Sequence, residues 1–297
     1  MTLALLVTMR PRQWTKNLLL FAGVLFSNNF LRLEMTLWAL AAAVVYCLLS
    51  GVVYIFNDVA DMESDRAHPD KRTRPIASGR LDAPAALVVG VALAGLALIG
   101  AFGINAPFGV CAILYFVLML AYSFFLKHVV ILDIMILALG FVLRAVAGVL
   151  AIRGLGEAVP MTPWFLACTL FLALFLAICK RRYELLMLDG AAESHRRVLS
   201  EYSPAFLDQM VSVSTAATVI SYAIYTTSAG AIGAGPGQDS PMVYTLPFVI
   251  YGVFRYLYHV YHMRRGGAPE VILLRDRWMI VNIVLWLAAV VYILSRY

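Results

Sequence analysis

Long apolar runs separated by short charged segments recur along the whole 297-residue sequence. Apolar and aromatic residues make up 62% of the chain and charged residues 13%, about half of the charged share found in soluble domains. A run of about 20 apolar residues forms a helix long enough to cross the hydrocarbon core of a bilayer. We therefore expect an all-α fold, a bundle of membrane-spanning helices that forms one domain over residues 1–297.

About nine segments are apolar enough to cross a bilayer. In chain order they are Asn17–Phe30, Met35–Phe56, Ala83–Phe102, Pro107–Phe125, Leu132–Ile152, Pro163–Cys179, Leu207–Ser228, Tyr244–Tyr258 and Trp278–Leu294. The first and the eighth of these segments are short. The apolar segment Thr2–Met9 precedes them and runs directly into Arg10, which favours a short helix on the membrane surface over a cleaved signal peptide.

Basic residues are distributed unevenly between the two sides of such a bundle. Most of the 23 Lys and Arg residues fall in the N-terminal segment and in the connections after the second, fourth, sixth and eighth spans. Because Lys and Arg are retained on the cytoplasmic side of a membrane, we expect the N-terminus and these connections in the cytoplasm. The expected location is a bacterial cytoplasmic membrane, with the functional site facing the cytoplasm.

Acidic residues are concentrated directly after the second span, in the stretch NDVADMESD. If the helix continues past Phe56, four polar residues of this stretch share one helix face; they are Asn57, Asp58, Asp61 and Asp65. Carboxylates this close repel one another unless a cation lies between them, and Mg²⁺ takes oxygen ligands from carboxylates and substrate phosphates. The stretch therefore predicts Mg²⁺ on the three aspartates beside Asn57. The alternative is a solvated helix end paired with nearby basic residues.

Basic side chains follow at once in the loop DKRTRP. This loop is expected to end the helix and to fold Lys71, Arg72 and Arg74 over the metal, where they would bind phosphate oxygens of a substrate. The alternative for each of them is a plain anchor on the cytoplasmic side of the membrane.

A second polar cluster lies between the fourth and fifth spans, in the stretch YSFFLKHVVILD. It places Tyr122, Lys127 and Asp133 at one edge of the membrane. Arg144 follows inside the fifth span, on the same helix face as Asp133. An Arg inside a membrane span indicates a functional site, and a structural pair with a carbonyl or carboxylate is the alternative.

A third cluster, KRRYEL, begins at the end of the sixth span, and HRRVLSEYS follows in the next connection. Lys180, Arg181 and Arg197 are candidates to bind a phosphate or a lipid headgroup, with a basic membrane anchor as the alternative.

Two of these stretches resemble a known family. NDVADMESD matches the NDxxDxxxD motif of the UbiA-type intramembrane prenyltransferase superfamily, and YSFFLK resembles its second motif, which reads YxxxK in many members. Here Lys127 follows Tyr122 by five residues, and Asp133 is the carboxylate nearby. The resemblance covers nearly the whole chain, and the nine expected spans match the helical bundle of the superfamily.

Three further stretches resemble the decaprenyl-phosphate phosphoribosyltransferase branch of that superfamily: RPRQWTKNLLLFAG, KRRYEL and HRRVLSEYSPAFL. The resemblance implies Mg²⁺-dependent transfer of 5-phosphoribose from phosphoribosyl pyrophosphate to a polyprenyl phosphate, with release of diphosphate, for cell-envelope glycan synthesis. Asp58, Asp61, Asp65, Lys127 and Arg144 would then be catalytic. Lys16 and Asn17, in the first stretch, would bind substrate, as would Asn57, Tyr122 and Asp133 in the two motifs.

The partners implied by this branch are phosphoribosyl pyrophosphate, a polyprenyl phosphate and membrane lipids, with no nucleic acid. An aromatic prenyltransferase that uses a polyprenyl diphosphate fits the same acidic motif. A transporter or a non-catalytic lipid-binding protein would also place charges at helix ends, but neither needs carboxylates at metal-binding spacing.

Overall fold

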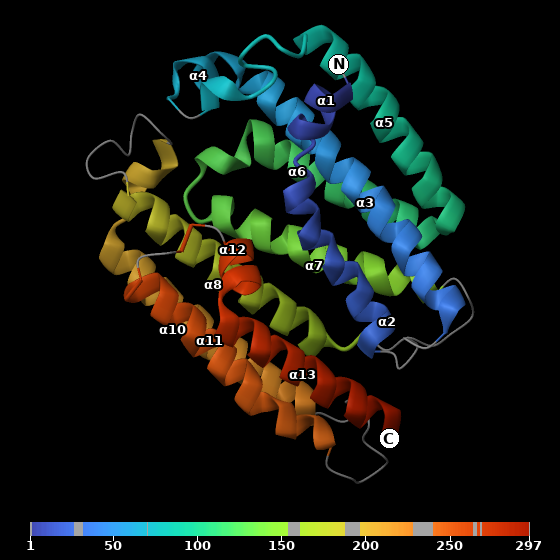
Figure 1. Cartoon of the computed structure of the whole chain (residues 1–297), viewed down its shortest axis with the longest axis vertical. Coiled ribbons are helices and arrows are strands. Elements are labelled where there is room, and N and C mark those ends of the chain that lie inside the picture. The colour runs from blue at the N-terminus through green and yellow to red at the C-terminus, as the bar shows by residue number, and fades with distance from the viewer. Residues whose placement is uncertain are drawn as a thin grey trace. The chain divides into compact units, whose positions relative to one another are not determined.

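Helices form every regular element in the described part of the structure, which is a computed structural model (Figure 1). The described residues are 2–26, 32–69, 71–153, 161–187, 197–227, 240–263, 266–267 and 269–296. The all-α fold class is therefore confirmed.

The contacts divide the helices into two compact units. The N-terminal unit comprises the described residues within 1–24, 29–136 and 143–159, and the C-terminal unit those within 25–28, 137–142 and 160–297. The first elements are α1 (Thr2–Thr8), η1 (Pro11–Phe21), α2 (Ala22–Phe26), α3 (Leu33–Ala60), α4 (Met62–Ala67), η2 (Lys71–Thr73), α5 (Ala83–Ile104), α6 (Ala106–Phe124), η3 (Leu126–His128) and α7 (Leu132–Arg153). The organisation as one domain stays a prediction.

The C-terminal unit is built mainly from α8 packed along α10, and from α11 packed against α13. Its elements are α8 (Pro163–Met187), η4 (Arg197–Glu201), α10 (Pro204–Thr227), η5 (Pro241–Thr245), α11 (Leu246–Tyr261), α12 (Pro269–Arg275) and α13 (Arg277–Arg296).

Asn105 makes the turn between α5 and α6 in a single residue. It ends α5, and its side-chain Oδ1 accepts a hydrogen bond of 2.8 Å from the backbone nitrogen of Phe108, which caps α6. Asn at this position satisfies a backbone donor that the first turn of a helix leaves without a partner. Its Nδ2 donates to the carbonyl of Leu150 at 2.9 Å. One side chain therefore fixes the turn and fastens it to α7.

Small and aromatic residues fill the core of the N-terminal unit, where α3 packs against η1, α5 and α6. The ring of Tyr46 lies 4.8 Å from that of Tyr115 and 5.8 Å from that of Phe108, measured between centroids. Ala42 and Ala97 are buried in the same cluster. Since lipid tails are as apolar as the side chains, close packing by such small residues holds membrane helices together.

The first expected span, Asn17–Phe30, differs from an uninterrupted α-helix. Residues 11–21 form the 3₁₀ element η1, which is followed by the short α2; residues 27–30 lie outside the described residues. Close contact with α7 accompanies this geometry, because a Cβ atom on Gly148 would lie 2.1 Å from the carbonyl oxygen of Leu20. The absence of a side chain at Gly148 lets the two backbones touch.

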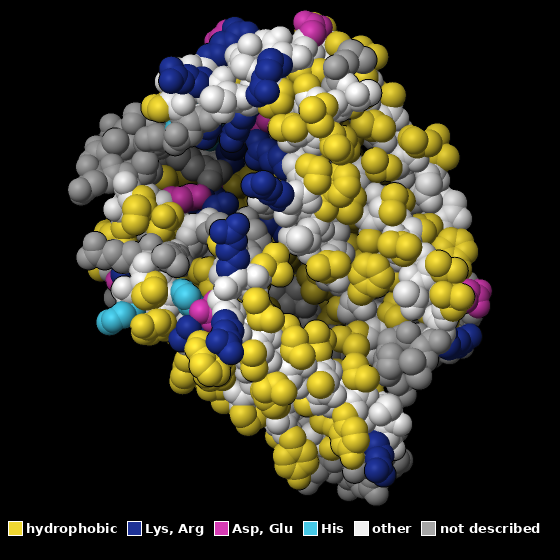
Figure 2. Space-filling view, in the orientation of Figure 1, with side chains coloured by type: hydrophobic (Ala, Val, Ile, Leu, Met, Phe, Trp, Pro, Cys, Tyr) yellow, Lys and Arg dark blue, Asp and Glu magenta, His cyan; other side chains and the backbone are white. Residues whose placement is uncertain are grey.

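Six helices within the described ranges are long and apolar enough to cross a membrane: α3, α5, α6, α7, α8 and α13. Of the other expected spans, α10 has 24 residues but is rich in Ser and Thr, and α11 has 16 residues. Figure 2 shows hydrophobic side chains over the face formed by α3 and α5, while Lys and Arg gather near α4. The count of nine spans and the cytoplasmic N-terminus stay predictions.

Candidate active site

The carboxylates of the NDVADMESD stretch lie where α3 passes into α4. Asp61 stands between the two helices with φ −92° and ψ 7°. Its backbone nitrogen still donates to the carbonyl of Asn57 at 2.9 Å, and that of Asp65 donates to the carbonyl of Asp61 at 2.8 Å. The hydrogen-bond spacing of an α-helix thus continues through the junction. The expected shared face of Asn57, Asp61 and Asp65 is preserved.

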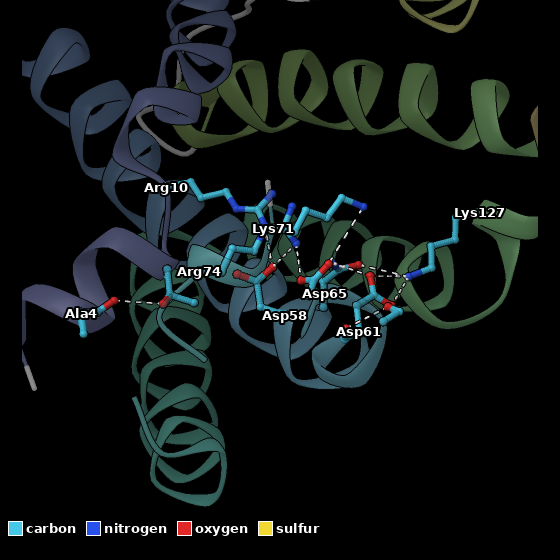
Figure 3. A network of polar contacts seen from close by, with 11 residues as sticks. Ala4, Arg10, Asp58, Asp61, Asp65, Lys71, Arg74 and Lys127 are labelled. Carbon is cyan, nitrogen blue, oxygen red and sulfur yellow. Dashed lines mark hydrogen bonds and ion pairs between the residues drawn. The ribbon is translucent and has the colours of Figure 1, made fainter. Parts of the chain in front are cut away.

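Asp58 and Asp65 are both buried and share one guanidinium (Figure 3). The NH1 atom of Arg74 lies 3.2 Å from Oδ1 of Asp58 and 2.6 Å from Oδ2 of Asp65. Lys71 Nζ lies 4.0 Å from Oδ1 of Asp65. A buried carboxylate needs a paired charge to remain ionised, so the loop after α4 supplies the charges that the helix end requires.

Asp61 pairs with the second polar cluster. Lys127, on η3 between α6 and α7, places its Nζ 2.8 Å from Oδ1 and 3.0 Å from Oδ2 of Asp61. The same Nζ lies 3.4 Å from Oδ1 of Asn57, whose Nδ2 donates to Asp61 at 3.1 Å. The structure therefore joins the two motifs that the sequence identified separately.

The remaining predicted residues of these two stretches lie beside this cluster in the chain. Tyr122 packs against the apolar core around Tyr115, and Asp133 is fully buried in the first turn of α7. Arg72 is exposed on η2. Contact of these three residues with a substrate stays a prediction.

Arg10 is a member of the site that the sequence reasoning missed. Its NH2 atom lies 2.5 Å from Oδ1 of Asp58, and its Cζ lies 4.5 Å from the centre of the Tyr54 ring. The stretch RPRQW contains this residue, but the sequence indicates there only the end of a surface helix and part of a family resemblance.

Arg144 lies in a buried network of its own. Its Nε donates to Oδ1 of Asn17 at 2.9 Å, and its NH2 donates to the hydroxyl of Tyr115 at 2.6 Å. Asn17 in turn approaches Cys47 Sγ at 3.2 Å, which connects η1 to α3. Lys16 precedes Asn17 on η1 and is half-buried. The network holds η1, α3, α6 and α7 together, and substrate binding by Lys16, Asn17 and Arg144 stays a prediction.

The third cluster belongs to the C-terminal unit. Arg181 is buried and paired with Glu184, whereas Lys180 is exposed over 42% of its side chain and lies 3.9 Å from the same carboxylate. Arg182 binds Oδ1 of Asp208 at 2.5 Å. Arg197 begins η4, and its side chain lies outside the described residues.

The carboxylates have the chemistry of a magnesium site. Across the described residues, no group of three or more His, Cys, Asp or Glu side chains converges as a metal site. Yet Asp58 and Asp65 lie so close that a single nitrogen of Arg74 contacts both. Carboxylates are hard oxygen donors of the kind that Mg²⁺ prefers, and this cation also keeps waters and phosphate oxygens in its shell. Asp58 and Asp65 supply carboxylate oxygens of the kind that such a cation takes, and metal binding by these residues stays a prediction.

Known proteins resemble this chain in sequence and in fold. Residues 18–280 match the profile of the UbiA prenyltransferase family. A decaprenyl-phosphate phosphoribosyltransferase of Corynebacterium glutamicum is 35% identical over 95% of this chain and 84% of its own length. Its counterpart from Mycolicibacterium smegmatis is 32% identical over 96% of this chain and 91% of its own. A UbiA homologue from Archaeoglobus fulgidus, solved with GPP and Mg²⁺, has a TM-score of 0.70 at 20% identity, covering 98% of this chain and 99% of that one.

Proposed function

We propose that this chain, which belongs to the UbiA prenyltransferase family, transfers 5-phosphoribose from phosphoribosyl pyrophosphate to a decaprenyl-like polyprenyl phosphate. The observation that carries the proposal is the near full-length similarity to proteins named decaprenyl-phosphate phosphoribosyltransferase. The chain is an integral membrane protein. We place its reaction in a bacterial cytoplasmic membrane, where the soluble donor would enter from the cytoplasm.

The chemistry of the carboxylate cluster supports this reaction. In it the bond between the anomeric carbon and the diphosphate breaks, and a phosphate oxygen of the acceptor forms the new bond to that carbon. Mg²⁺ held by Asp58, Asp61 and Asp65 would neutralise charge on the leaving diphosphate. The acceptor phosphate is ionised at neutral pH, so the chain need not supply a general base.

The basic side chains around the carboxylates have the complementary task. Lys127 and Arg74 already hold Asp61 and Asp65 through charged hydrogen bonds. When a cation takes over these carboxylates, the same groups are available to donate to diphosphate oxygens. Donors fixed in this way stabilise negative charge as it develops on a leaving group.

The 5-phosphate of the donor needs a cation of its own, and we propose the third cluster for it. Of Lys180, Arg181 and Arg197, Lys180 has the most exposed side chain among those described. Lys180→Ala is expected to raise KM for phosphoribosyl pyrophosphate about tenfold and to change kcat little, because this contact is similar in the ground and transition states. Steady-state kinetics measures the split, with Lys180→Arg as the control that keeps the charge. A fall in kcat at unchanged KM contradicts this role.

Purified protein in lipid nanodiscs tests the reaction itself. With Mg²⁺, phosphoribosyl pyrophosphate and decaprenyl phosphate, we expect release of diphosphate and a phosphoribosylated lipid detectable by mass spectrometry. The competing family activity, prenyl transfer to an aromatic acceptor, is assayed in parallel with an allylic diphosphate and an aromatic acid. Product in the second assay alone contradicts the proposed donor and leaves the family membership intact.

A further inference from the structure

Arg10 has a backbone conformation that is unusual for a residue other than glycine. Its φ is 53° and its ψ is 65°, in the left-handed region. It stands between α1 and η1: its nitrogen donates to the carbonyl of Val7 at 3.1 Å, and its carbonyl accepts from Gln13 at 2.8 Å. Such a conformation is strained for a residue with a side chain and persists only where the surroundings enforce it, frequently at functional sites.

Packing of the preceding residue enforces this conformation. Met9 is buried against the backbone of α3 at Gly51, where an added Cβ would come within 2.6 Å of the Met9 Cε atom. The Tyr54 ring, one turn further along α3, lies under the guanidinium of Arg10. These contacts aim the Arg10 side chain at Asp58, and 29% of that side chain stays exposed.

Asp58 is paired with two guanidinium groups through the same oxygen. Its Oδ1 lies 2.5 Å from Arg10 NH2 and 3.2 Å from Arg74 NH1, and its side chain is almost fully buried. A divalent cation that binds this oxygen would therefore compete with both guanidinium groups. The two side chains are about equally exposed, but Arg74 also holds Asp65, whereas the carboxylate that Arg10 contacts is Asp58, so Arg10 has the fewer contacts to lose.

We propose that Arg10 is a binding residue that changes partner. Without metal it neutralises Asp58, and when a divalent cation binds Asp58 its guanidinium moves to the diphosphate group of the donor. The planar fork of an Arg side chain matches phosphate oxygens as well as it matches a carboxylate. This inference rests on the proposed function only in requiring a divalent cation and a diphosphate at the site.

The exchange predicts that removing the Arg10 side chain changes two binding affinities in opposite directions. Arg10 competes with the cation for Asp58, so its removal strengthens the binding of Mg²⁺ alone. Arg10 also holds the diphosphate, so its removal weakens the binding of diphosphate in the presence of Mg²⁺. About tenfold in each direction is expected, the size of one charge-assisted hydrogen bond. A residue that merely stabilised the fold would not shift the two affinities in opposite directions.

Calorimetry on the full chain in detergent or nanodiscs measures both affinities. Mg²⁺ is titrated alone, and inorganic diphosphate is then titrated at saturating Mg²⁺, for the unmodified protein, Arg10→Ala and Arg10→Lys. Arg12→Ala is the matched control, because Arg12 is an exposed Arg of the same segment. We expect opposite shifts for Arg10→Ala, smaller shifts for Arg10→Lys, which keeps the charge without the fork, and none for Arg12→Ala.

Shifts of the same sign, or no shift, in Arg10→Ala overturn the proposal. If thermal unfolding shows that Arg10→Ala does not fold, Arg10→Lys is the test variant. Its affinities for Mg²⁺ alone and for diphosphate with Mg²⁺ must then shift in opposite directions. Because the probe is inorganic diphosphate, opposite shifts support this proposal even if phosphoribosyl pyrophosphate proves not to be the donor. In that case only the proposed function fails.

Discussion

Replacing Asp58, Asp61 or Asp65 with Asn is expected to lower turnover about 10²–10³-fold, the usual cost of removing one electrostatic partner from a transition state. The substitution keeps the shape of the side chain and removes the negative charge that holds the cation. Asp58 and Asp65 share Arg74, and Asp61 holds Lys127. Each change should therefore disturb the metal and its basic neighbours together.

Glu63→Gln is the matched control for these variants, since Glu63 is an exposed acid of the same stretch. It is expected to keep normal turnover. Diphosphate release is measured over a range of Mg²⁺ concentrations, with the yield of monodisperse protein as the check on folding. Near-normal activity of all three Asn variants at low Mg²⁺ would remove the metal role from these residues.

Gly148→Ala is expected to cause the largest loss of stability, about 3 kcal/mol, at the upper end of the usual cost of overpacking. The new methyl group would lie 2.1 Å from the carbonyl oxygen of Leu20, and that contact is with backbone, which cannot rotate away. η1 must therefore move off α7, and the Asn17–Arg144 hydrogen bond of 2.9 Å would break with it.

The control for this variant is Gly95→Ala. Gly95 is an exposed residue of α5, and an added Cβ would meet no atom within 4 Å. Because Ala favours a helix more than Gly does, Gly95→Ala is expected to be neutral or slightly stabilising. Thermal unfolding in detergent measures both variants. Equal midpoints for the two would contradict the close contact between η1 and α7.

The carboxylate register could be predicted from the sequence because it depends on local geometry. Side chains four residues apart share a helix face wherever the hydrogen bonds connect residues i and i+4, and those bonds continue through Asp61. The end of α4 before His68 and Pro69 also follows from local sequence. The same holds for the short loop that brings Arg74 back to Asp65. Pattern and spacing were sufficient for this part of the site.

The rest of the site depends on contacts between distant segments, which spacing does not encode. Lys127 meets Asp61 across 66 positions, and Arg10 meets Asp58 across 48. The resemblance to a family pointed to Lys127, but the left-handed backbone that aims Arg10 has no signal in composition or periodicity. The 3₁₀ geometry of η1 was missed for a related reason, since it accompanies a contact with Gly148 far along the chain.

The length of α3 determines the depth at which the chemistry takes place. Its 28 residues span about 42 Å at 1.5 Å per residue, whereas the hydrocarbon core is about 30 Å thick. Asn57 and Asp58 lie in the last turn of this helix, so a placement that keeps the apolar part of α3 in the hydrocarbon core would bring them close to the lipid phosphates. Anionic headgroups would then compete with phosphate-bearing substrates for the Arg and Lys side chains beside Asp58. We therefore expect the lipid composition of the bilayer to affect the catalytic rate.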